Sequence, residues 1–243
     1  MKAHLNTLLI ALAVVITAGI LSSAYLNRGK KQNSISVTGL GSKDFVSDLI
    51  VWSGNFTRKN SDLKTAYAEL DADRETIKKY LAEQGVPAEK MVFSSISIEK
   101  ESSPTYDKFG NQNGSIFSGY RLQQIVEIES GEVDKIEGIS REVSRLINQG
   151  VEFYSHTPQY FYTKLAALKI EMIAEATKDA SIRAQKIAEN AGSEVGRLKT
   201  AEMGVFQIVG QNSAEEYSWG GSFNTTSKRK TASITVKLDY EVD

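Results

Sequence analysis

Cysteine is absent from this chain of 243 residues, and histidine occurs only at His4 and His156. Without cysteine there are no disulfides, no thiol catalysis, no cysteine-ligated metal and no acylated N-terminal cysteine. With only two histidines there is no histidine cluster to bind zinc or to build a Ser–His pair. We therefore expect no metal, no cofactor and no catalytic residue, and a fold that is held together by packing alone.

Concentrated positive charge is also missing. The formal net charge is -1, and lysine and arginine are scattered along the chain. Nucleic-acid-binding domains ordinarily carry a basic patch or stripe, so we expect no nucleic-acid partner. Proline occurs at only three positions and 41% of the residues are hydrophobic, so the chain has enough apolar material to bury a core in one domain or in two small ones.

The N-terminal part contains an uncharged run from Leu5 to Leu26. About 20 uncharged residues are enough to span the roughly 30 Å hydrocarbon core of a membrane. We therefore expect residues 5–26 to contact the membrane as a transmembrane signal anchor, within a segment of residues 1–31 that includes a basic flank. A cleaved signal peptide is one alternative, because Ser22–Ala24 offers a passable cleavage site. A buried helix of a soluble protein is the other.

Charges around this run bear on its orientation. Lys2 and the terminal amino group precede it, whereas Arg28, Lys30 and Lys31 follow it. Positive charge normally stays on the cytoplasmic side. By an excess of a single charge, this count favours a cytoplasmic location for the rest of the chain.

The clearest helical pattern lies between Lys164 and Ala191. Apolar and small residues recur at steps of three and four on one face, which predicts an amphipathic helix of roughly 42 Å. We expect Thr163 to cap its start and Gly192 to end it. The predicted buried face consists of Ala166, Ile170, Ile173, Thr177, Ala180, Ala184, Ile187 and Ala191. Because alanine dominates this face, we expect the helix to pack on a sheet; a coiled coil is the alternative.

The same helix carries a resemblance to a known family. The residues concerned are Ala176, Asp179, Ala180, Arg183, Ala184, Ile187, Ala188, Ala191, Gly192, Val195, Gly196, Arg197 and Leu198. They resemble the signature of the SIMPL domain family, which includes the bacterial periplasmic immunogenic protein, and the resemblance extends from about Ile35 to the C-terminus. It implies export to the periplasm or cell exterior, against the charge count. It also implies ring-like or channel-like homo-oligomers and a link to oxidative-stress tolerance, with no catalytic residues attached to the signature.

The region of residues 44–161 alternates strand and helix signals. One helical pattern begins after a cap at Asn60 or Ser61 and ends at Gly85, and a second begins after Ser130 and ends at Gly150, with extended apolar segments around them. The resulting βαββαβ order is that of a ferredoxin-like sandwich. We therefore predict an α+β fold for residues 32–243. In it, residues 35–43 and 162–243 add the long helix and antiparallel strands to the ferredoxin-like unit.

Several local expectations accompany this fold. A hairpin turn is expected at Gly39–Ser42, and residues 102–118 are expected to form a polar hairpin tip. We expect Trp52 to lie in the core and His156 to be an ordinary sheet residue rather than a ligand or base. On the first helix, Leu63, Ala66, Tyr67, Leu70, Ile77 and Leu81 are predicted to face inward, whereas Asp71, Asp73, Arg74 and Glu75 are predicted to face solvent.

A second long loop, residues 210–227, contains large aromatic residues among glycines. Tyr217, Trp219 and Phe223 are therefore candidate interface residues. The alternative is that these rings fold back and cap the protein's own core. After this loop, alternation of apolar and polar residues from Thr231 to Val242 predicts a half-buried strand.

Three functional hypotheses follow. The first is a non-enzymatic protein of the cell envelope, anchored in the inner membrane or secreted to the periplasm, that assembles with copies of itself or with an envelope partner. The second is a periplasmic binding module for a small molecule or glycan. The third is a hydrolase. A pocket with converging polar groups of perturbed pKa favours the second or third, whereas exposed apolar loop tips favour the first.

Overall fold

The structure, a computed structural model, describes residues 11–23, 34–216 and 218–242. These residues divide into two compact units. One contains the described residues up to Leu40, Glu175–Gly204 and those from Thr235 onward, and the other contains Gly41–Ala174 and Val205–Ile234. Helices and two sheets are both present, so the predicted α+β class is confirmed.

A helix covers residues 11–23 at the start of the described chain. Residues 5–10 and 24–26, which belong to the predicted membrane anchor, lie outside the described residues. Among the parts of the chain that the structure describes, no helix has the length and apolar character needed to cross a membrane. The predicted transmembrane helix over residues 5–26 is therefore not confirmed.

The first sheet has the strand order β1-β11-β9-β10, with β8 paired to β11. Its strands are β1 (Ser34–Val46), β8 (Val195–Met203), β9 (Gln207–Gly210), β10 (Ser222–Phe223) and β11 (Arg229–Val242). In β11 the buried residues include Ala232, Ile234, Val236 and Leu238, which confirms the predicted alternation. Between α4 and the loop of residues 211–227 the chain forms two separate strands, β8 and β9.

The predicted hairpin turn at Gly39–Ser42 is wrong, because β1 runs through these residues without interruption. Gly39 is needed for a different reason. A Cβ atom at this position would overlap the backbone O of Ala176 and the backbone N of Ala180, and would lie 2.8 Å from the Cβ of Ala180. The glycine therefore allows β1 to pass directly against the helix that follows residue 164.

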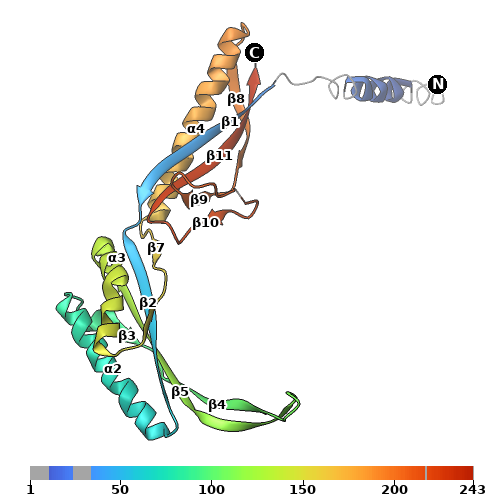
Figure 1. The fold of residues 1–243 in the computed structure, drawn as a ribbon. Helices are drawn as coiled ribbons and strands as arrows, with labels where there is room; N and C mark the ends of the chain where they lie inside the picture. Colours follow the sequence, from blue (N-terminus) through green and yellow to red (C-terminus); the bar gives the residue numbers. More distant parts are fainter. Residues whose placement is uncertain (1–10, 24–33, 217, 243) are drawn as a thin grey trace. The chain divides into compact units, whose positions relative to one another are not determined.

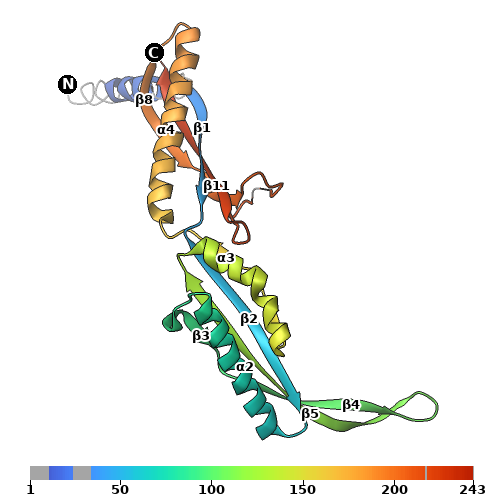
Figure 2. The ribbon, with the colours of Figure 1, turned by 60° about the vertical axis from the view of Figure 1, so that its left-hand side comes forward.

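That helix is α4 (Leu165–Asn190), and it lies along β1 and β11 (Figure 2). The backbone N of Leu40 donates to Asp179 Oδ2 at 2.9 Å, which fixes the helix to β1. This hydrogen bond lowers the pKa of Asp179, and the Arg183 guanidinium lowers it further. Packing on a sheet, rather than in a coiled coil, is therefore confirmed.

The buried line of α4 differs from the predicted one. It advances in steps of four residues and consists of Leu168, Met172, Ala176, Ala180, Ala184 and Ala188. Of the predicted face, only Ala180 and Ala184 belong to this line, whereas Ile170 is 71% exposed and Ile187 is 50% exposed. Around the middle of the helix the close approach of β1 explains the shift, since Gly39 leaves room only for small side chains at Ala176 and Ala180.

The predicted cap of α4 is also wrong. The hydroxyl of Thr163 donates to Asp48 Oδ2 and its backbone N donates to Asp48 Oδ1, both at 2.7 Å. Thr163 thus contacts the bend before β2 rather than the start of the helix. At the other end Gly192 has φ +72°, the left-handed conformation that was predicted.

The second sheet has the order β3-β5-β2-β6, with β4 paired to β5 and β7 paired to β2, and these neighbours are antiparallel. Its strands are β2 (Leu49–Asn60), β3 (Met91–Phe93), β4 (Ser97–Tyr106), β5 (Gln112–Ser130), β6 (Phe153–Ser155) and β7 (Gln159–Phe161). The associated helices are α2 (Leu63–Glu83), α3 (Val133–Glu142) and the short 3-10 segments η1 (Ala88–Lys90) and η2 (Val143–Gln149). Figures 1 and 2 show α2 and α3 on one face of this sheet. The assignment of this unit as ferredoxin-like stays a prediction.

The core of this unit lies between the sheet and its two helices. Its fully buried side chains include Trp52, Phe56, Leu70, Ile77, Leu122, Ile128 and Leu146. Trp52 is thus a core residue, as predicted. The start of α2 differs by one to two residues, because Asp62 is the cap and accepts a hydrogen bond from the Thr65 backbone N at 2.8 Å. Leu63 and Tyr67 are exposed, contrary to prediction.

Asp73 was predicted to face solvent, but it is only 4% exposed. Arg58 of β2 reaches it with two hydrogen bonds, from Nε to Oδ2 at 2.5 Å and from Nη2 to Oδ1 at 2.7 Å. The same Nη2 donates to the carbonyl O of Gly150 at 2.7 Å. An ion pair therefore ties β2, α2 and the end of η2 together.

The predicted polar tip over residues 102–118 is mostly strand. β4 and β5 pair as far as Tyr106 and Gln112, so only residues 107–111 form the turn. The Asp107 carboxylate shapes it by accepting hydrogen bonds from the backbone N of Phe109 and of Asn111. This hairpin extends past α2 and α3 (Figures 1 and 2).

Candidate functional site

The loop of residues 211–227 is organised by two polar side chains. Gln207 Nε2 donates to the carbonyl O of Ser218 at 2.7 Å, and its Oε1 accepts from the backbone N of Ser222 at 2.9 Å. The Glu215 carboxylate accepts from the backbone N of Gly210 at 3.1 Å and from Asn224 Nδ2. The described residues of the loop therefore have a defined shape, although among them only Ser222 and Phe223 are in a strand.

This loop carries the predicted interface residues. Trp219 is fully exposed and Phe223 is 53% exposed, whereas Tyr217 lies outside the described residues. The alternative, in which the aromatic rings cap the protein's own core, is wrong for Trp219. A solvent-exposed tryptophan side chain on an ordered loop is the type of residue that often contributes most of the binding energy at a protein interface.

Beneath Phe223 lies a lysine that sequence reasoning missed. Lys230 is only 1% exposed, its Nζ donates to the carbonyl O of Tyr160 at 2.5 Å, and it lies 5.9 Å from the centre of the Phe223 ring. Burial lowers its pKa to about 8. A signal was present, because Lys230 is in phase with Ala232 and Ile234 on the buried side of β11.

The neighbouring Lys228 is bound by carboxylates of α3. Its Nζ forms ion pairs with Asp134 and with Glu137, the latter at 3.0 Å, and these two hydrogen bonds raise its pKa. Burial, together with Glu137, raises the pKa of Tyr160. The start of β11 is therefore fixed to α3 by a charged network beside the loop.

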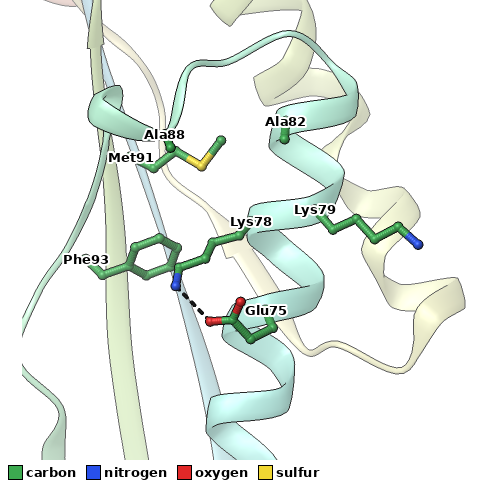
Figure 3. Close-up of a pocket in the computed structure, with 7 residues that line it drawn as sticks. All are labelled: Glu75, Lys78, Lys79, Ala82, Ala88, Met91 and Phe93. Carbon is green, nitrogen blue, oxygen red and sulfur yellow. Dashed lines mark hydrogen bonds and ion pairs between the residues drawn. The ribbon is translucent and has the colours of Figure 1, made fainter.

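A surface hollow with mainly apolar walls lies between α2, η1 and β3, and we call it the α2–β3 pocket. It has a volume of about 320 Å³ and is lined by Glu75, Lys78, Lys79, Ala82, Ala88, Met91 and Phe93. Figure 3 shows Met91 and Phe93 facing the helix across the hollow, with Lys79 pointing away from them. The floor is apolar and the charges stand at the rim.

Lys78, Glu75 and Phe93 of this pocket contact one another. Lys78 Nζ donates to Glu75 Oε1 at 2.7 Å, which lowers the pKa of Glu75, and lies 5.6 Å from the centre of the Phe93 ring. The Phe93 ring in turn packs edge-on against buried Phe56 with centroids 6.3 Å apart. The wall of the pocket is therefore held in place by the core.

His156 does more than an ordinary sheet residue. Its Nδ1 lies 3.1 Å from Ser53 Oγ and its Nε2 lies 3.0 Å from Asn55 Oδ1. If Nε2–H donates to Asn55, Nδ1 is left to accept the hydroxyl proton of Ser53. A hydroxyl, a base and a group that orients the base are thus adjacent, an arrangement used to activate nucleophiles. Sequence reasoning could not find it, because Ser53 and His156 are 103 positions apart.

Within the described residues, no group of three or more His, Asp or Glu side chains is arranged to hold a metal ion. Trp219, the α2–β3 pocket and the Ser53–His156 pair are lined by different residues and do not form one site. The described part of the chain therefore offers an aromatic loop, an apolar pocket and a polar cluster formed by β2 and by His156, directly after β6.

Comparison with protein families gives one match. The SIMPL family, described as a protein of unknown function (DUF541), matches residues 35–240. No curated protein matches the chain. The matched region includes β1, α4, β8 and most of β11, which contain the residues that carried the resemblance in the sequence. The chain therefore belongs to the SIMPL family.

Proposed function

We propose that this SIMPL protein is exported to the cell envelope and assembles there with further copies of itself through the loop of residues 211–227. The observation that supports this most directly is the full exposure of Trp219 on a loop with a defined shape. An aromatic side chain that buries 150–250 Å² gains about 4–6 kcal/mol at roughly 25 cal/mol per Å². Without a partner, this apolar area stays in water.

The pockets favour assembly over the binding of a free small molecule. Most small-molecule sites bury most of their ligand in a concave cavity with converging polar groups. In the α2–β3 pocket the polar groups Glu75 and Lys78 pair with each other instead. Exposed apolar side chains occur on the β4–β5 hairpin as well, at Tyr106, Phe109, Ile116 and Phe117. Exposed apolar side chains are sufficient for assembly, which requires no catalytic residues.

The test uses the purified full-length protein and its mass in sedimentation experiments. Replacing Trp219 and Tyr217 together by alanine should lower the mass of the assembly. Because Trp219 is fully exposed and contributes little to folding, the melting temperature should stay within about 2 °C of the wild-type value. Tyr67→Ala, which removes an exposed aromatic ring from α2, is the matched aromatic control and should leave the mass unchanged. If the double variant keeps its mass and melts earlier, the rings stabilise the fold rather than the assembly.

Export is proposed to depend on the N-terminal segment of residues 1–31. A phosphatase reporter fused to the C-terminus, active only outside the cytoplasm, should be active in cells. An inactive reporter would support the opposite orientation, which the flanking charges favour. A mature N-terminus near Tyr25 would identify the segment as a cleaved signal peptide.

A role in tolerance of envelope or oxidative stress follows from the family resemblance alone. Growth of a deletion strain in the presence of peroxide tests this role.

We also propose that residues 44–161 form a ferredoxin-like unit. The strand order β3-β5-β2-β6, the antiparallel neighbours and the position of both helices on one face support this assignment. An experimental structure of the protein tests it.

A second candidate function, hydrolysis at Ser53, is favoured by the Ser53–His156–Asn55 cluster. In this reaction Ser53 Oγ bonds to the acyl carbon of an ester while His156 takes the hydroxyl proton and passes it to the departing alkoxide. Water then releases the acid and restores the serine. A fluorophosphonate probe should label wild-type protein and fail to label Ser53→Ala or His156→Ala, with exposed Ser102→Ala as the control. Equal labelling of all four proteins, or of none, would contradict this role.

A further inference from the structure

We infer that Trp219 of one copy binds in the α2–β3 pocket of a second copy. The inference rests on the proposed function and names the surface that the aromatic loop meets. Both features belong to the same compact unit of each chain, so each copy presents one indole and one pocket.

Size is the first argument. The pocket measures about 320 Å³, at the low end of the roughly 300–1,000 Å³ found for small-molecule sites. That volume suits one bicyclic side chain better than a drug-sized ligand. Ala82 and Ala88, which line the pocket, are exposed to solvent, so a side chain from a second copy has access to it.

The chemistry of the walls matches an indole. Ala82, Ala88 and Met91 provide apolar contact, and a methionine sulfur packs favourably at the edge of aromatic rings. Lys78 already lies over one ring, that of Phe93, at 5.6 Å. A cation held at this place interacts favourably with a second aromatic face, and tryptophan is the best partner for such a contact.

Charge does not oppose the same contact. The loop of residues 211–227 contains Glu215 and Glu216 and no lysine or arginine, which gives it two negative charges. The pocket is lined by two lysines and one glutamate. Glu75 is paired with Lys78, so the excess positive charge is that of Lys79, whose side chain points away from Met91 and Phe93 (Figure 3). The negative loop therefore meets no excess of negative charge at the pocket.

Both partners are organised before they meet. Gln207 and Glu215 hold the loop, and Phe56 holds the Phe93 wall. Binding thus immobilises few additional side chains, which otherwise cost about 0.5–1.5 kcal/mol each. Because the indole and the pocket are different surfaces, repeated contacts of this kind build rings or filaments unless two copies exchange both contacts and close as a dimer.

The decisive variant fills the pocket from an exposed position. Ala82→Arg places a long side chain over Met91 and Phe93 on the solvent-facing part of α2, and should lower the mass of the assembly as much as Trp219→Ala does. Ala68→Arg, an equally exposed alanine earlier in α2 that does not line the pocket, should assemble like the wild type.

Mixing the variants tests the pairing itself. Trp219→Ala protein keeps its pocket and Ala82→Arg protein keeps its indole, so an equimolar mixture should form complexes of twice the monomer mass that neither variant forms alone. Tryptophan emission should shift to shorter wavelengths in the mixture, because Trp219 leaves water while Trp52 is buried throughout.

Three results overturn the inference in distinguishable ways. If the wild type is a monomer at every concentration, the proposed assembly itself is wrong. If the wild type assembles and Trp219→Ala reduces its mass, but Ala82→Arg assembles normally or the mixture stays monomeric, the indole binds another surface. Binding of a free indole compound with no change in mass would assign the pocket to a small ligand and also overturn the inference.

Discussion

Replacing Asp73 by alanine should destabilise the protein by about 3 kcal/mol. The change removes two charge-assisted hydrogen bonds from Arg58, and breaking a buried ion pair costs about 3–5 kcal/mol because one charge is left without a partner. The Arg58 side chain is 32% exposed and keeps its hydrogen bond to the Gly150 carbonyl O, so the cost should fall at the low end. Urea denaturation at pH 7 measures it as a lower midpoint with an unchanged slope.

Asp71→Ala is the matched control for this prediction. Asp71 lies on the same helix and pairs with Arg74, but its side chain is 41% exposed, and surface pairs contribute about 0–1 kcal/mol. Equal effects of the two substitutions would refute the reasoning, because they would mean that Asp73 is solvated in the folded protein. The double variant Arg58→Met with Asp73→Leu should recover most of the loss, since it leaves no unpaired charge.

Three further predictions concern the fold. Burial lowers the pKa of Lys230 to about 8 in the folded protein, while the pKa in the unfolded chain is about 10.5. The unfolded chain therefore binds more protons between pH 8 and 10.5, and the stability of the wild type relative to Lys230→Met should rise by up to about 3 kcal/mol across this range and stay constant below pH 8. Urea denaturation at a series of pH values measures this difference. Gly39→Ala should destabilise by at least about 3 kcal/mol through its overlap with α4, whereas Gly138→Ala in open helical space should stabilise by up to about 1 kcal/mol, as measured by thermal unfolding. Ala180→Leu should cost about 1–3 kcal/mol and Lys178→Ala less than about 0.5; equal melting temperatures would place Ala180 on the surface.

Structural features that depend only on residues close together in the sequence could be predicted. The alternation in β11 and the left-handed glycines at Gly85, Gly150 and Gly192 are local features, and the structure has them where the sequence places them. The family signature in α4 is local in the same sense, since its spacing lies within one helix and the following strand. Element type was therefore more predictable than the partners of each element.

Contacts between distant residues could not be predicted. Asp73 looks like one more acidic residue on a helix until Arg58 is placed beside it, and Lys230 is bound by a carbonyl 70 positions away. On α4, several lines of small residues compete for burial, and the path of β1 decides which one is covered. The composition of residues 102–118 did not indicate two paired strands, because both faces of this hairpin are exposed and its residues do not alternate between buried apolar and exposed polar side chains.

The steps of four residues along α4 limit how its length can change during evolution. A helix turns by about 100° per residue, so the contact line rotates by about 40° at each step and by about 120° from Ala176 to Ala188. Insertion of one residue after Ala180 would bring Arg183 and Ile187 to the places that Ala184 and Ala188 now occupy against the sheet. Relatives of this chain should therefore vary by substitution on the outer faces of the helix and by length in turns such as residues 107–111, while the number of residues between Ala176 and Ala188 stays constant.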